Sequence, residues 1–151
     1  MLEIYVDADA CPVKEEIYRV AGRHGLRVWV VTNGWLRVPD DPLVTRVTVT
    51  EGLDRADDWI AERIGPGDIA VTADVPLADR CVKRGARAIA PNGRPFTEAS
   101  IGADLATRNL MTALREAGEI RGGGRPFTKR DRSRFLGALD AAIQAVRRTG
   151  R

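Results

Sequence analysis

LEIYVDADA (residues 2–10) and GDIAVTAD (residues 67–74) decide the fold. In the first, Ile4 and Val6 flank Tyr5 in a short apolar run that ends abruptly in polar residues, which predicts a buried strand. In the second, residues 69–71 form a continuous apolar run, which is typical of a parallel strand covered on both faces. A helical pattern follows each stretch, opened by Pro12 and by Pro76. Both stretches therefore predict a β-α unit.

The rest of the chain continues this alternation of strands and helices. Residues 26–32, 44–50 and 86–91 read as strands, and the strict period-two pattern of 44–50 suggests an edge. Residues 53–64, with Asp54 as the cap, and residues 76–84, 99–117 and 133–148 read as helices. Alternating strands and helices imply a parallel sheet with right-handed crossovers. We expect a single α/β/α domain over residues 1–151, with five strands and two extra C-terminal helices.

Composition is consistent with one globular domain. The 151 residues are 44% hydrophobic and 30% charged, and this length is enough for a single core. The two cysteines, Cys11 and Cys81, lie outside any CxxC or Cys/His cluster, so neither a disulfide framework nor a zinc site is predicted. No apolar run approaches membrane-spanning length and no signal peptide is visible. We therefore expect a cytoplasmic protein that does not engage a membrane.

Charge is distributed unevenly along the chain. Residues 1–118 hold 15 Lys and Arg against 18 Asp and Glu, whereas residues 119–151 hold 9 against 3. The basic excess is concentrated in a Gly-containing connection at 119–134 that precedes the last helix. It predicts contact with a nucleic-acid backbone, expected to be RNA, unless it is only a solvated surface. The expected contacts are Arg121, Arg125, Lys129, Arg130, Arg132 and Arg134.

Aspartates gather where the predicted strands end. Asp7 and Asp9 are two residues apart, so in an extended segment both side chains would leave on the same side. Asp74 follows its own strand in the same position, and the 53–64 helix adds Asp57 and Asp58. In parallel sheets ligands bind outside the carboxyl ends of the strands, where the winding reverses. Asp7, Asp9 and Asp74 are thus the predicted catalytic residues.

Clustered carboxylates repel one another unless a cation or a shared proton intervenes. Mg²⁺ or Mn²⁺ would relieve this repulsion and leave coordination positions for phosphate oxygens. The predicted metal ligands are Asp7, Asp9, Asp57, Asp58 and Asp74. The expected reaction is divalent-metal-dependent cleavage of a phosphodiester.

Four segments carry a resemblance to a known family: VDADACPVK (6–14), LDRADDWI (53–60), GDIAVTADVPLA (67–78) and GRPFTKRDRSRFLGALD (124–140). Together they resemble the YaiI/YqxD family of uncharacterised bacterial proteins. More widely, the chain is similar to PIN-like and NYN-like nuclease domains at Asp7, at Asp57 or Asp58, and at Asp74. That resemblance implies strand order 3-2-1-4-5 and metal-dependent RNA cleavage. The Cys11-Pro12 continuation and the basic C-terminal helices depart from the nuclease pattern.

Two further polar residues belong to these matching regions. Thr72 fits the small hydroxyl residue that often precedes the last aspartate of the nuclease pattern, and we place it in the nucleic-acid site. Arg108, in LATRNLM (105–111), matches a polar segment of the family. It would reach a phosphate or pair with a nearby carboxylate.

Two other functions compete with a nuclease. DADAC and VVTN resemble the first motifs of haloacid-dehalogenase-type phosphatases, in which Asp7 would be the nucleophile and Asp9 the general acid. The other alternative is a non-catalytic RNA-binding or regulatory module on the same fold.

His24 reads as a cation at the end of its helix, not as a base. Trp35 reads as a stacking surface for a base or, more simply, as a packed loop anchor.

Overall fold

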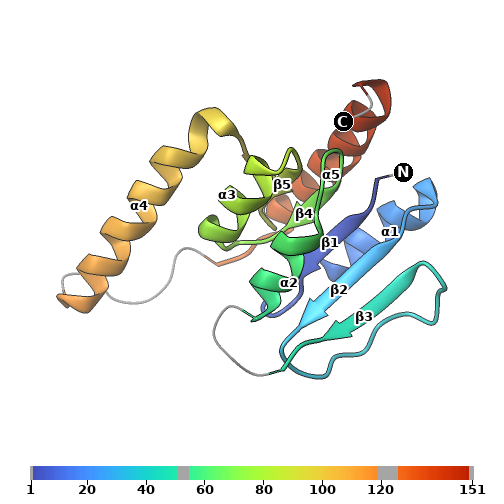
Figure 1. Cartoon of the computed structure of the whole chain (residues 1–151), viewed down its shortest axis with the longest axis horizontal. Coiled ribbons are helices and arrows are strands. Elements are labelled where there is room, and N and C mark those ends of the chain that lie inside the picture. The colour runs from blue at the N-terminus through green and yellow to red at the C-terminus, as the bar shows by residue number, and fades with distance from the viewer. Residues whose placement is uncertain (1, 51–54, 119–125, 150–151) are drawn as a thin grey trace.

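In the computed structural model, which describes residues 2–50, 55–118 and 126–149, one sheet lies between two layers of helices (Figure 1). The strands are β1 (Ile4–Asp7), β2 (Val28–Thr32), β3 (Val44–Thr48), β4 (Ile69–Val71), β5 (Arg87–Ile89) and β6 (Pro95–Phe96). The helices are α1 (Lys14–His24), α2 (Arg55–Arg63), α3 (Val75–Lys83), α4 (Glu98–Glu116) and α5 (Lys129–Thr149). None of the helices in the described ranges is long and apolar enough to span a bilayer.

The strand order is β3-β2-β1-β4-β5-β6. Strands β1 to β5 are parallel to their neighbours, so the expected order 3-2-1-4-5 and the edge position of β3 are confirmed. The expected count of five strands was wrong, because β6 pairs antiparallel with β5 through Ala88–Phe96 and Ile89–Pro95. Strands β1 and β4 are neighbours, with Ile4 opposite Ile69 and Val6 opposite Val71. This is the reversal point of the winding, where ligands bind in such sheets.

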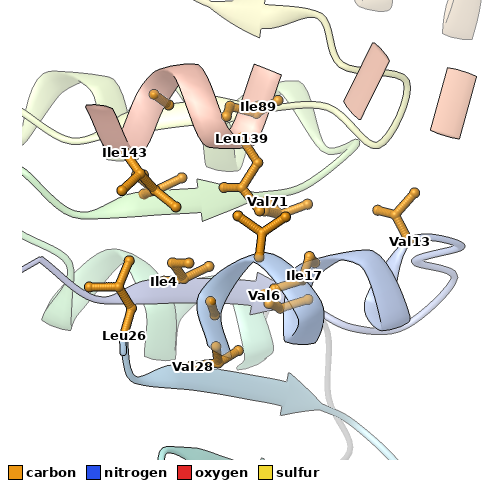
Figure 2. Packing of buried hydrophobic residues seen from close by; sticks show 14 of the residues in the cluster. Ile4, Val6, Val13, Ile17, Leu26, Val28, Val71, Ile89, Leu139 and Ile143 are labelled. Carbon is orange, nitrogen blue, oxygen red and sulfur yellow. The ribbon is translucent and has the colours of Figure 1, made fainter. Parts of the chain in front are cut away.

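One face of the sheet packs against α1 and α5. Residues from β1 and β4, including Ile4, Val6 and Val71, meet Leu139 and Ile143 of α5 in a fully buried cluster (Figure 2). Helix α5 thus covers the strands that carry the candidate site, although it comes last in the described chain. The N-terminal sheet and the C-terminal helix share one core.

The opposite face packs against α2 and α3. Tyr5 and Ala70, which alternate with the residues of the first face, join Ile60 of α2 and Leu77 of α3 there. Trp29 and Trp59 pack with Tyr5, with ring centroids 5.7 to 6.4 Å apart. Continuous apolar runs in β1 and β4 are therefore explained by burial on both sides of the sheet.

Several helix boundaries differ from those expected. Helix α1 begins at Lys14, since residues 12 and 13 form a turn, and it ends as expected at Gly25, whose φ of 66° suits a glycine. Helix α5 begins four residues earlier than expected, because the Thr128 hydroxyl accepts a hydrogen bond from Asp131 N–H and Asp131 Oδ2 accepts one from Thr128 N–H. The expected Asp54 cap lies outside the described residues.

His24 joins α1 to α5. Its Nε2 is hydrogen-bonded to Asp140 Oδ1 at 2.8 Å, and Arg147 donates to His24 Nδ1 and to the His24 carbonyl oxygen. Arg147 therefore satisfies a carbonyl group at the end of α1. The side chain of His24 therefore links α1 to α5, in addition to its position at the end of α1.

Candidate functional site

Asp7 and Asp74 are linked at the carboxyl ends of β1 and β4 through Thr72. The Thr72 hydroxyl donates to Asp7 Oδ2 at 2.8 Å and accepts from the Asp74 N–H at 2.9 Å. Thr72 is only 1% exposed, so it positions both aspartates and does not present its side chain to a nucleic acid. Its backbone N–H donates to Ile89 O, which extends the β4–β5 pairing beyond the end of β4.

Asp7 is a half-buried carboxylate in an unfavourable electrostatic environment. Burial raises the pKa of Asp7 above its usual range, and the negative charges of Asp74 and Asp9 raise it further, while the hydrogen bond from Thr72 opposes them. Within the described residues Asp7 Oδ1 accepts no hydrogen bond. An ionised Asp7 therefore has one oxygen available for a cation or a donor group.

Asp74 combines a structural role with a free oxygen. Its Oδ1 accepts from Leu77 N–H at 3.0 Å and so caps α3, which starts at Val75 with Pro76 in its first turn. Its Oδ2 receives no hydrogen bond from the described part of the chain. The cap fixes the orientation of the carboxylate through Oδ1 and leaves Oδ2 on the other side of the group.

Asp9 is held differently from Asp7. The strand ends at Asp7 and residues 8–10 form a turn, so the alternation that predicted a shared side does not extend to Asp9. Asp9 Oδ1 accepts from the Thr32 hydroxyl at 2.6 Å, and Oδ2 accepts from Asn33 N–H at 2.8 Å. The two oxygens thus tie the turn after β1 to the last residue of β2 and to the first residue of the loop that follows it.

The two acidic residues of α2 face different surroundings. Asp58 Oδ1 pairs with Arg80 Nη1 of α3 at 2.9 Å. Burial raises the pKa of the Cys81 thiol to about 12, and the charges of Asp57 and Asp7 both act to raise it. The charge of Asp57 therefore acts on the buried Cys81 thiol, whereas Asp58 is paired with Arg80 of α3.

The arrangement offers two available carboxylate oxygens, one from Asp7 and one from Asp74. Across residues 2–50, 55–118 and 126–149, no three His, Cys, Asp or Glu side chains come together as a group that could hold a metal ion. The five-ligand set expected from the sequence is therefore not assembled as one group in this conformation. Two carboxylates nonetheless match the way proteins hold Mg²⁺, which retains several waters and binds substrate phosphate.

The predicted basic contacts fall into three sets. Lys129, Arg130 and Arg134 lie exposed in the first turns of α5. Arg132 donates to the Pro12 carbonyl oxygen at 2.6 Å and stacks over the Phe127 ring, so it holds α5 against the start of α1. Arg121 and Arg125 lie outside the described residues.

Arg108 lies on α4, which packs mainly against α3. Its side chain is exposed and its guanidinium donates to Asn109 Oδ1 at 3.5 Å. The structure thus brings Arg108 to a neighbouring amide and not to a carboxylate.

Lys14 is a cation near the site that the sequence patterns did not indicate. Its Nζ donates to the Cys11 carbonyl oxygen at 2.8 Å across the turn between β1 and α1. Burial raises the pKa of the Cys11 thiol, and Lys14 and Asp7 then act on it in opposite directions. Lys14 therefore lies beside Cys11, in the turn that follows β1. The closed turn between β1 and α1 brings Lys14 close to the end of β1, and no sequence pattern marks a lysine at this position.

Both cysteines are buried, as expected for packed thiols.

Trp35, in contrast, is 73% exposed. Arg46 stacks over its ring at 5.2 Å and donates to the Leu36 carbonyl oxygen. The packed-anchor interpretation of Trp35 was therefore wrong.

Comparison with known proteins identifies the family. The model of the uncharacterised bacterial YaiI/YqxD family matches residues 5–145. The chain belongs to this family. A "UPF0178 protein" of Rhodopseudomonas palustris (strain BisB18) is 66% identical over 148 residues, covering 98% of this chain and 96% of the relative. "UPF0178 protein BRADO3147" of Bradyrhizobium sp. (strain ORS 278) is 65% identical over 147 residues, covering 97% and 90%.

Another relative has a similar match. A "UPF0178 protein" of Nitrobacter winogradskyi is 65% identical over 147 residues, covering 97% of this chain and 94% of the relative. No solved structure matches the chain. These family and relative names state no activity, so the function has to be argued from the site.

Proposed function

We propose that this YaiI/YqxD family member is a divalent-metal-dependent nuclease with RNA as its substrate. The observation that supports the proposal best is the pairing of Asp7 and Asp74 through Thr72 at adjacent parallel strand ends. Each aspartate keeps one oxygen that is not engaged by the described residues. A half-buried carboxylate beside two others requires a compensating positive charge when all are ionised.

Asp7 Oδ1 and Asp74 Oδ2 would hold the metal. Mg²⁺ or Mn²⁺ in this position would lower the pKa of a bound water and neutralise the phosphate charge. Thr72 would keep both carboxylates in place through its two hydrogen bonds. The Lys14 ammonium, at the turn after β1, is available to attract a phosphate oxygen.

The basic residues at the start of α5 support a nucleic-acid substrate. Lys129, Arg130 and Arg134 are exposed, and the Arg132 contact with Pro12 brings this turn of α5 to the beginning of α1. The beginning of α1 is separated from the end of the Asp7 strand only by residues 8–13. A phosphate backbone that contacts these cations would pass close to the carboxyl ends of the strands, without any requirement for base identity.

The hydrogen bonds of Asp9 weigh against the haloacid-dehalogenase-like mechanism. That mechanism uses the second aspartate as general acid, and here both Asp9 oxygens accept hydrogen bonds from Thr32 and Asn33. A water nucleophile activated beside Asp7 and Asp74 needs no such role for Asp9. A non-catalytic RNA-binding module would use the same basic surface and differ only in turnover.

A cleavage assay tests the proposal. Single-stranded RNA, duplex RNA and single-stranded DNA would be incubated with the full chain and Mg²⁺ or Mn²⁺, using the parent, Asp7→Asn and Asp74→Asn. We expect metal-dependent cleavage that each substitution reduces by at least about 100-fold, the lower range for loss of a group that stabilises a transition state. Asp40→Asn, at an exposed position in the β2–β3 connection, is the matched control. Turnover that survives both Asp7→Asn and Asp74→Asn would exclude this site, and RNA binding without turnover would support the non-catalytic alternative.

A further inference from the structure

A pocket of about 420 Å³ lies near the segments that carry the aspartates, towards β5 and β6. Its walls come from the turn after β1, the start of α3 and the connection between β5 and β6. Ala73 and Val75 belong to the lining and flank Asp74 in the sequence. A molecule in this pocket would therefore contact the residues on both sides of Asp74, whereas the side chains of Asp74 and Asp7 are not part of the lining.

The pocket is mainly apolar and has aromatic walls. Phe96, which is 7% exposed, and Phe127, which is half-buried, belong to its lining, together with the small residues Ala10, Ala73 and Ala90. Ala10 adopts a φ of 65°, which is rare for a residue other than glycine. Such backbone strain occurs preferentially at functional sites.

The polar part of the pocket is small and directional. Asn92 Oδ1 accepts from Arg94 N–H at 3.0 Å, which leaves the Asn92 amide nitrogen as a donor. The Arg94 guanidinium pairs with Asp104 and lies over the Phe96 ring, 6.0 Å from its centroid. The charge of Arg94 is therefore paired with that of Asp104, and the mostly apolar lining suits a flat, mostly neutral group with a polar edge.

The pocket is preformed. Gly93 N–H donates to the Ala90 carbonyl oxygen at 2.8 Å and Ala90 N–H donates to the Arg94 carbonyl oxygen at 2.9 Å, so the turn between β5 and β6 is closed. This turn rests against the α5 backbone at Arg134 and Phe135. Binding would require little ordering of the wall, which lowers its entropic cost.

We propose that this pocket binds a nucleobase of the substrate, the nucleotide whose phosphate adjoins Asp7 and Asp74. Aromatic faces stack with any base, and one amide donor can reach a base edge. The proposal rests on the proposed nuclease function for its choice of substrate. It adds a base subsite to that function and predicts a requirement for unpaired bases, since a base in a duplex cannot enter.

The test is calorimetric binding of AMP, UMP, ribose 5-phosphate and inorganic phosphate to the full chain in the presence of Mg²⁺. The two nucleotides should bind more tightly than ribose 5-phosphate by roughly 5- to 140-fold, the range for one stacked base. Ala73→Phe should fill the pocket from an exposed position and remove this difference, while the affinity for ribose 5-phosphate stays unchanged. Ala106→Phe, at an exposed position on α4, is the matched control and should preserve the difference.

A second variant shows whether a loss of nucleotide binding in Ala73→Phe comes from the pocket itself. Phe127→Ala removes one aromatic wall from a half-buried position and should reduce the affinity for AMP and UMP without changing that for inorganic phosphate. Equal affinities of AMP and ribose 5-phosphate for the parent chain would overturn the base subsite, as would an unchanged preference in both Ala73→Phe and Phe127→Ala.

Failure of the nuclease proposal would look different. In that case the parent would cleave no nucleic acid, whereas its preference for AMP over ribose 5-phosphate and the loss of that preference in Ala73→Phe would still be measured. Conversely, cleavage that depends on Asp7 but proceeds equally in the parent and in Ala73→Phe, with equal use of single and double strands, would overturn the base subsite alone.

Discussion

Substitution of Gly93 by alanine tests how tightly the β5–β6 turn is held against α5. A Cβ at Gly93 would lie 2.7 Å from the Arg134 carbonyl carbon, 2.8 Å from its oxygen and 2.9 Å from Phe135 N, all backbone atoms that cannot rotate away. Gly93 also has a φ of +91°. A non-glycine residue in a left-handed conformation costs about 1–2 kcal/mol, and forcing extra volume into a packed contact costs about 1–3 kcal/mol. Gly93→Ala should therefore destabilise the fold by about 2–5 kcal/mol.

For a chain of this length each kcal/mol corresponds to about 2–4 °C in Tm, so calorimetry should show Tm lower by about 4–20 °C. Gly137→Ala is the control because Gly137 is exposed on the same helix α5 and an added Cβ there meets nothing within 4 Å. That substitution should stabilise the helix by about 0.5–1 kcal/mol. A Tm of Gly93→Ala equal to that of the parent would show that the turn does not rest on α5 as described, and would also remove the argument that the pocket is preformed.

Burial and neighbouring charges raise the pKa of Asp7 in the folded chain, so the folded state binds more protons than the unfolded one and stability should fall as pH rises between the unfolded and folded pKa values. Asp7→Asn should consequently have a higher Tm than the parent at neutral pH in metal-free buffer, and the difference should shrink on acidification; a lower Tm at neutral pH would contradict this. Arg130→Ala combined with Arg134→Ala should reduce the log-log salt slope of single-stranded RNA binding by about 1.4, or about 0.7 for each lost phosphate contact, and an unchanged slope would assign these exposed arginines to solubility only. Leu139→Ala, in the core shared by α5 and the sheet, should cost about 2–5 kcal/mol in urea unfolding, and a loss below about 1 kcal/mol would show that α5 is not packed there. The buried Cys81 thiol, with its pKa raised to about 12, should react with a thiol reagent only after unfolding, and rapid reaction of the native chain would refute its burial.

The parallel part of the fold could be predicted because its signals are local and repeated. Apolar runs such as Ile69–Val71 mark strands buried on both faces, and the resemblance supplied their order. Strand β6 escaped prediction because Pro95 and Phe96 are too few for any periodicity, and their pairing depends on the turn at Gly93. The early start of α5 likewise depends on a reciprocal cap, which a sequence pattern indicates only when the helix register is known.

The candidate site was predictable where it depends on topology and not where it depends on turn geometry. Asp7 and Asp74 meet because β1 and β4 are neighbours, and this followed from the expected strand order. The role of Asp9 did not follow, since the strand ends before it and its oxygens are bound by Thr32 and Asn33. Thr72 was expected to contact nucleic acid, and its burial could not be read from a hydroxyl at a strand end.

The position of α5 has a consequence for how the protein is made. Ile4, Val6 and Val71 are covered by the helix that is synthesised last among the described elements, through residues such as Leu139 and Ile143. A nascent chain that has already emerged up to β5 still exposes to water the part of this apolar face that α5 covers, because α1 packs against only the rest of it. Folding during translation therefore cannot be completed until α5 leaves the ribosome, and the strand ends carrying Asp7 and Asp74 gain their final rigidity only at that moment. A ribosome stalled before α5 should hold a chain that chaperones bind through this uncovered face.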